Sequence, residues 1–166
     1  MFELKTLSPE AVPRALAKAE RYRLLNEPGE AESICHDVLA VDPLNQEVIA
    51  TLLLAITEQF DAGTTCVSEA WKTVGRLTDE YERAYYSGII YERRAKALLK
   101  HATPRGGPRA YEWLREAMAC YDKAEELRPP NNDDALLRWN ACARLIMSNH
   151  HLVPMSEDPG EPLPLE

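Results

Sequence analysis

The stretch "AESICHDVLAVDP", residues 31–43, decides the fold because its spacing returns later in the chain, in "AMACYDKAEELRP", residues 117–129. Steps of four and three residues return a side chain to the same side of an α-helix, and a proline ends a helix near the residue before it. Each stretch therefore predicts a helix, and the two helices share the same spacing of residues on one side and a proline at the end. The recurring positions are Ala31, Cys35, Val38 and Pro43 in the first copy and Ala117, Tyr121, Ala124 and Pro129 in the second.

The helix expected before each copy also carries a shared pair, a small residue followed three positions later by tyrosine. These pairs are Ala19 with Tyr22 and Gly88 with Tyr91. Small, aromatic, alanine, bulky, alanine and proline, in this order over two helices, resembles the tetratricopeptide repeat, a helical hairpin of about 34 residues. In such arrays the small residues lie where two helices approach closely, and several hairpins in a row bury a shared core.

The resemblance covers residues 9–147 and implies an all-α fold, a helical-hairpin array of about seven helices with no sheet. No stretch has the period-two alternation of a half-buried strand. A lead-in over residues 1–8 precedes the array, and residues 148–166, acidic and rich in proline, are expected to be a disordered tail. The expected units are hairpins over 9–42, 45–77 and 79–128 and a capping helix over 132–147.

The segment "VIATLLLAI", residues 48–56, is apolar apart from Thr51, although 28% of the chain is charged. In tetratricopeptide arrays the first helix of each hairpin lines a concave groove, so part of this segment is expected to form an apolar groove floor. The same register places tyrosine and arginine residues of the other first helices around it. The predicted groove comprises Leu16, Glu20, Arg23, Ile49, Leu53, Ile56, Tyr85, Ile89, Arg93, Asn140 and Arg144.

The function implied by the resemblance is protein binding: a non-enzymatic adaptor or scaffold that holds a partner's helix or peptide in this groove, with arginines contacting its carboxylates. On this interpretation Leu53→Glu should leave the helices intact and abolish binding. Two alternatives stay open, a dedicated chaperone for an aggregation-prone partner and a self-associating protein such as a homodimer. The Lys/Asn/Asn/Lys/Arg clamp of chaperone-tail binders is absent, because its positions hold Leu16, Glu20, Ala50, Glu82 and Tyr86.

The composition excludes other classes of protein. A net charge of -8 argues against nucleic-acid binding, which needs clustered lysine and arginine. No segment approaches the roughly 18 consecutive apolar residues of a membrane span, and the first residues lack a secretory signal. The four cysteines form no CxxC pair, which favours free thiols in a reducing compartment. We therefore expect a cytoplasmic protein without a cofactor.

Three stretches carry residues that can do chemistry, and none predicts an enzyme or a metal site. Cys35 in "ICHDV" has His36 and Asp37 beside it, but adjacent helical residues point about 100° apart and form no relay. His150 and His151 in "NHHLVPM" have no further ligand at a recognised spacing. The basic loop "TPRGGPR", residues 103–109, lacks the phosphate-binding P-loop pattern, so a solvent-exposed connection is favoured over a phosphate or acidic-peptide site.

Overall fold

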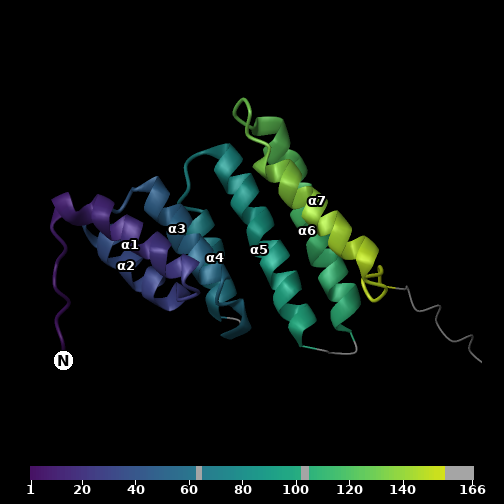
Figure 1. Cartoon of the computed structure of the whole chain (residues 1–166), viewed down its shortest axis with the longest axis horizontal. Helices are drawn as coiled ribbons and strands as arrows, with labels where there is room; N and C mark the ends of the chain where they lie inside the picture. The colour runs from purple at the N-terminus through teal and green to yellow at the C-terminus, as the bar shows by residue number, and fades with distance from the viewer. Residues whose placement is uncertain (63–64, 102–104, 156–166) are drawn as a thin grey trace, which may run out of the picture.

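The computed structural model describes residues 1–62, 65–101 and 105–155, and every regular element in these ranges is helical (Figure 1). This confirms the predicted all-α fold class for the part of the chain that is described. Short 3-10 helices, η1 (Pro9–Ala11) and η2 (Phe60–Ala62), precede the first and the fourth α-helix. The α-helices are α1 (Val12–Leu24), α2 (Pro28–Val41), α3 (Gln46–Thr57), α4 (Thr65–Val74), α5 (Glu80–Lys100), α6 (Gly106–Leu127) and α7 (Asp134–Ser148).

Asparagine and aspartate fix several of the helix ends. The side chains of Asn45 and Asp79 each accept a hydrogen bond from the backbone N–H three residues on, at 3.1 Å and 3.0 Å, and so cap α3 and α5. Asn26 and Asn131 adopt positive φ angles of 59° and 64° in the turns after α1 and α6, a conformation that asparagine tolerates better than most residues. These short polar turns reverse the chain between successive helices.

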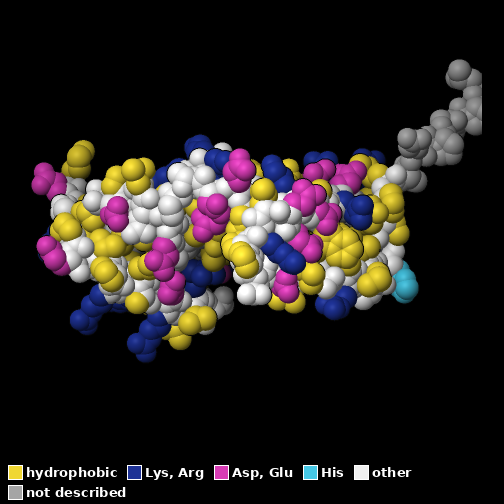
Figure 2. Space-filling view, turned by 90° about the horizontal axis from the view of Figure 1, so that it is seen from above, with side chains coloured by type: hydrophobic (Ala, Val, Ile, Leu, Met, Phe, Trp, Pro, Cys, Tyr) yellow, Lys and Arg dark blue, Asp and Glu magenta, His cyan; other side chains and the backbone are white. Residues whose placement is uncertain are grey.

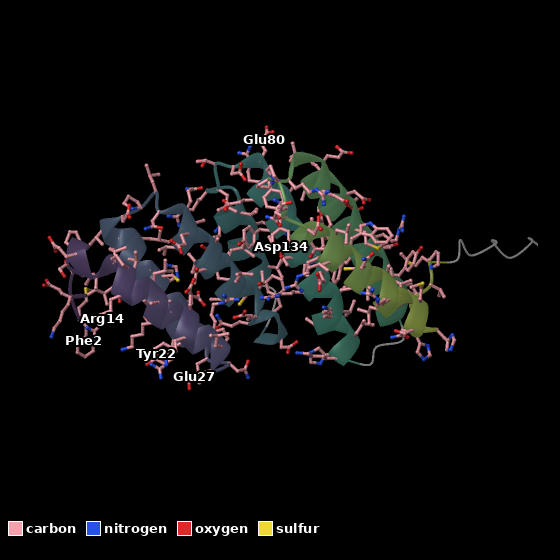
Figure 3. The ribbon with its side chains drawn as sticks, turned by 45° about the horizontal axis from the view of Figure 1, so that its top comes forward. Phe2, Arg14, Tyr22, Glu27, Glu80 and Asp134 are labelled. Atoms are coloured by element: carbon pink, nitrogen blue, oxygen red, sulfur yellow. The ribbon has the colours of Figure 1, made fainter. Side chains whose placement is uncertain are left out.

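Each helix packs against the next one along the chain, and α1 contacts α3 as α3 contacts α5. Helix α5 begins at Glu80, at the top of Figure 3, and α7 begins at Asp134, near the middle of the same view. Both run downward from there, so these two helices run in broadly the same direction. Helices α1, α3 and α5 thus lie side by side, with α2 and α4 returning between them, and α7 lies against α6 (Figure 1). Side chains of α1, α3, α5 and α7 can therefore share one face.

Helix α3 explains the apolar segment 48–56. It contacts α1, α2, α4 and α5, so neighbouring helices surround it. Every residue of the segment except Leu54 is buried. A helix of 12 residues with partners on all these sides can be apolar all the way round, and no helix in the described ranges is both long and apolar enough to cross a membrane.

The apolar interior is divided into two clusters. One joins α1 to α4, which we call the N-terminal block, and the other joins α5 to α7, the C-terminal block. Helix α5 belongs to both, because Ile90 packs into the first cluster while its neighbour Ile89 packs into the second. Contact within the α5–α6 hairpin is much more extensive than contact between α4 and α5. The two blocks therefore meet along a thinner seam than the one inside the α5–α6 hairpin.

The residues predicted to allow close helix packing lie where helices touch. Gly88 of α5 faces the ring of Tyr121 on α6: a Cβ atom at Gly88 would lie 2.4 Å from Tyr121 Cε1. Tyr22 is half-buried, Tyr91 contacts Trp71 edge-on at 5.1 Å, and Pro43 and Pro129 are exposed just beyond α2 and α6. The predicted packing residues with no exposed surface are Ala19, Ala31, Ala117, Tyr121 and Ala124.

Gly88→Ala is expected to destabilise the protein by about 1–3 kcal/mol, because the added methyl group would overlap the body of a buried ring and force it to move. Gly29→Ala is the matched control, since its Cβ would meet only Gln59 Oε1 at 3.7 Å. Thermal or urea unfolding followed by circular dichroism measures both. Equal stability of the two variants would show that the Gly88–Tyr121 approach is looser than the structure has it.

The C-terminal tail differs from the expectation. Residues 156–166 lie outside the described ranges, but Ser148 still belongs to α7, and residues 149–155 follow a defined path. Leu152 is buried, 3% exposed, in the core of the C-terminal block. A Cβ atom on Gly107, in the first turn of α6, would lie 2.2 Å from the backbone oxygen of His151. The predicted disorder from residue 148 is thus wrong up to residue 155, because an apolar side chain anchors this segment.

Gly107→Ala is expected to displace residues 149–155, since a backbone oxygen cannot turn away as a side chain can. Hydrogen exchange measured by mass spectrometry should become faster in this segment and stay unchanged in α1 and α2. Unchanged protection of residues 149–155 would contradict the predicted contact.

Candidate functional site

Three arginines from three odd-numbered helices form the most distinctive polar feature of the molecule. We call Arg23 of α1, Arg93 of α5 and Arg138 of α7, with the carboxylates Glu58 and Glu92, the arginine row. Arg23 donates to Glu58 through Nε and Nη2, with Nη2 2.6 Å from Oε1. Arg93 Nη1 lies 3.4 Å from the same oxygen. Glu58, at the end of α3, therefore joins α1 to α5.

Arg93 is held in place by the end of α3. Its Nη1 donates to the Leu54 carbonyl oxygen at 3.0 Å and to Thr57 Oγ1 at 2.7 Å. Burial lowers the pKa of Arg93, as do the charges of Arg138 and Arg23, while Glu58 acts in the opposite direction. Arg93 is thus an ordered cation with cations on both sides of it, and the row is continuous from α1 to α7.

Glu92 is the second carboxylate of the row, and its side chain is 1% exposed. It accepts from the Tyr121 hydroxyl at 2.6 Å, from Lys96 Nζ at 2.5 Å and from Arg138 Nη1 at 3.3 Å. Burial alone would raise the pKa of this carboxyl, but the hydrogen bonds from Lys96 and Tyr121 and the two positive charges lower it. Glu92 is therefore ionised at neutral pH and ties α5 to α6 and α7.

Tyrosines of α5 lie beside the arginines. Tyr85 stacks on Tyr81 at 5.9 Å and meets Tyr86 edge-on at 5.2 Å. Tyr85 and Tyr86 are both half-buried, and burial raises the pKa of Tyr86 to about 12. Each ring offers an apolar surface and a hydroxyl group next to a guanidinium group, a combination common where proteins bind peptides.

The charge of the row differs from that of the whole chain. The network holds four cations, the three arginines and Lys96, against two carboxylates, in a chain of net charge -8. Several guanidinium N–H groups of the row have no acceptor among the described residues, such as Nη1 of Arg23. Seen from above, acidic and basic side chains alternate over the middle of the molecule and do not separate by sign (Figure 2). The row is thus a local excess of ordered donors, suited to a carboxylate-bearing ligand.

The predicted apolar groove floor is wrong. Four of its members are between 0% and 2% exposed and pack inside the two cores, so they have no surface for a partner: Ile49, Leu53, Ile56 and Ile89. Leu16, 8% exposed, is also core. The residue of α3 that reaches this face is Leu54, which the sequence analysis missed. Because the residues around Leu54 are apolar too, residue type could not show which of them is only half-buried.

The polar residues of the predicted groove are only partly where the sequence placed them. Arg23 and Arg93 lie on the shared face as predicted, and Tyr85 is half-buried there, while Glu20 is an exposed residue of α1. On α7 the row uses Arg138, whereas Asn140 and Arg144 lie about 160° and about 120° away from it around the helix. Arg138 was missed because α7 carries two arginines and the sequence offers no register to choose between them.

The stretches considered for chemistry contain one buried thiol and three exposed histidines, His36, His150 and His151. Cys35 is fully buried, and burial raises the pKa of its thiol to about 12, so it stays protonated. His36 lies 3.6 Å from Glu32, one turn away. Within the described ranges, no three histidine, cysteine or acidic side chains are grouped as metal ligands. Residues 103 and 104 of the loop 103–109 lie outside these ranges.

Searches against protein-family models, curated proteins and solved structures find no match to this chain.

Proposed function

We propose that this chain is a tetratricopeptide-like, non-enzymatic interaction module that binds an acidic segment of a partner protein across the arginine row. The observation that carries the proposal is the alignment of Arg23, Arg93 and Arg138 on one face, each from a different helix and each oriented by a protein carboxylate. Ordered side chains lose little conformational freedom on binding, which favours affinity.

The neighbouring tyrosines and Leu54 support a peptide over a small anion. Tyr85, Tyr86 and Leu54 are half-buried and give the row an apolar border. A segment that combines carboxylates with apolar side chains would satisfy both features. All four cysteines are free, which supports a reducing compartment such as the cytoplasm.

The test is partner capture from a lysate of the source cells with tagged wild-type protein and with Leu54→Glu, which adds a negative charge to the row. Leu44→Glu is the matched control, because Leu44 is 79% exposed and lies before α3, away from the row. We expect a protein held by wild type and by Leu44→Glu and lost from Leu54→Glu, with capture weakening as salt rises. Identical captures by all three would refute the proposal, and capture of the chain alone would favour self-association.

A further inference from the structure

A second cationic feature lies on a different side of α5. The guanidinium carbon of Arg94 lies 4.0 Å from the ring centre of Trp113 on α6, and that of Arg109, also on α6, lies 5.5 Å from the same centre. Adjacent residues of a helix point about 100° apart, so Arg94 faces away from the side that Arg93 gives to the arginine row. One indole thus contacts two guanidinium groups, outside the proposed partner site.

These two cations are not neutralised within the described part of the chain, where no acidic side chain forms an ion pair with Arg94 or Arg109. Asp61, the acidic residue of the neighbouring cleft, is 2.7 Å from Lys100 and so already paired. Burial and the charge of Arg109 lower the pKa of Arg94. Cation–π contact with the indole offsets part of the repulsion between the two guanidinium groups. A bound anion would offset the remaining repulsion.

An open cleft of about 330 Å³ lies beside Arg94 and Trp113, between α4, α5 and α6. Its apolar lining comes from η2, α4 and α5, while its polar lining consists of Asp61, Arg94, His101 and the indole of Trp113. The cleft can hold the atoms next to an anionic group as well as the group itself. The apolar lining residues are Phe60, Val67, Ala97 and Leu98.

We infer that Arg94 and Arg109 form a binding site for a phosphomonoester, with the phosphate between the two guanidinium groups and its substituent in the cleft. A phosphomonoester carries nearly two negative charges at neutral pH and three strong acceptor oxygens. Two guanidinium forks supply matching charge and paired N–H donors. A single carboxylate would neutralise only one of the cations. The phosphate belongs either to a small molecule or to a phosphorylated side chain of a peptide.

The experiment is a titration of the full-length protein followed by the indole N–H signals of its three tryptophans in nuclear magnetic resonance. The probes are inorganic phosphate, free phosphoserine, and an acetylated pentapeptide with phosphoserine flanked by leucines, beside the same peptide unphosphorylated. The proteins are wild type, Arg94→Gln and Arg109→Gln. Arg115→Gln is the control, an exposed arginine of the same helix outside the stack.

We expect the Trp113 signal to shift with the phosphorylated probes and the Trp139 signal to stay, with binding at least tenfold weaker in Arg94→Gln and Arg109→Gln and unchanged in Arg115→Gln. Equal affinity for phosphoserine and phosphopeptide would identify a small phosphomonoester as ligand, and preference for the phosphopeptide a modified protein. An absence of binding, equal binding of the unphosphorylated peptide, or equal loss in Arg115→Gln would overturn the inference. Arg109 is exposed, so its variant keeps the test valid if Arg94→Gln unfolds.

Discussion

Leu53→Glu is expected to unfold the N-terminal block, at a cost above about 4 kcal/mol. The Leu53 side chain has no exposed surface and packs at the centre of the first core. Glutamate there would lose the apolar contacts and bury a carboxyl group with no partner, one of the few mechanisms that produce effects of this size. Circular dichroism and urea unfolding measure the loss.

Leu54→Glu is the matched control for this prediction, since the same substitution is made one residue further along the same helix. Leu54 is half-buried on the face of the arginine row, and its carbonyl already contacts Arg93. A carboxylate there can reach water and nearby cations, so we expect a folded protein that loses about 1–2 kcal/mol of stability. If the two variants are equally stable, the rotation of α3 about its axis is wrong.

Glu92→Ala is expected to cost about 3–5 kcal/mol, because removing one partner from a buried ionic network leaves the others unsatisfied. The hydroxyl of Tyr121, itself fully buried, would lose its acceptor at 2.6 Å, and Arg138 its contact with α5. Glu116→Ala, an exposed glutamate of α6, should change stability by less than about 0.5 kcal/mol. Urea unfolding at pH 7 compares them, and similar costs would mean that the network contributes little.

The same network predicts how stability depends on pH. The folded protein lowers the pKa of Glu92 below its ordinary value of 4.5. The stability contributed by the ionised carboxylate is therefore fully present above about pH 4.5 and is lost as pH falls through the folded-state pKa. Glu92→Gln keeps an acceptor for Tyr121 but does not titrate. The stability difference between wild type and Glu92→Gln should shrink below pH 4.5; a constant difference would exclude Glu92 as the titrating group.

Much of the helical pattern could be predicted from the sequence because local residues set it. Pro43 and Pro129 mark the ends of α2 and α6, and the small residues at Ala31 and Ala117 mark buried helix sides. The tail could not be predicted, because the contact between Gly107 and the backbone of His151 joins residues far apart in the chain. The prediction of disorder used the acidic, proline-rich composition of residues 148–166 as a whole, and such an average does not show that the single residue Leu152 anchors part of the segment.

The candidate site was predicted in part. Arg23 and Arg93 stand out as charges next to apolar positions, so their helix faces could be assigned. In α3 nearly every residue is apolar. Rotating the helix about its axis would bring a different residue to the surface, but that residue would again be apolar, so the sequence does not fix the rotation. The partners of the arginines could not be predicted either, since Glu58 and Glu92 are 35 and 46 residues from Arg23 and Arg138. Such pairings depend on how helices cross, which spacing does not specify.

The seam between the two blocks has a consequence for dynamics. Units with separate cores and limited shared contact often open independently, and native-state exchange detects them as distinct cooperative units. Arg23 and Glu58 belong to the first block and Arg93 and Arg138 to the second, so the row crosses the seam. A ligand held by both sides would bind the closed form alone and, by thermodynamic linkage, oppose opening. Binding of the partner and separation of the two halves are then coupled equilibria, so a change that favours separation weakens the affinity for the partner.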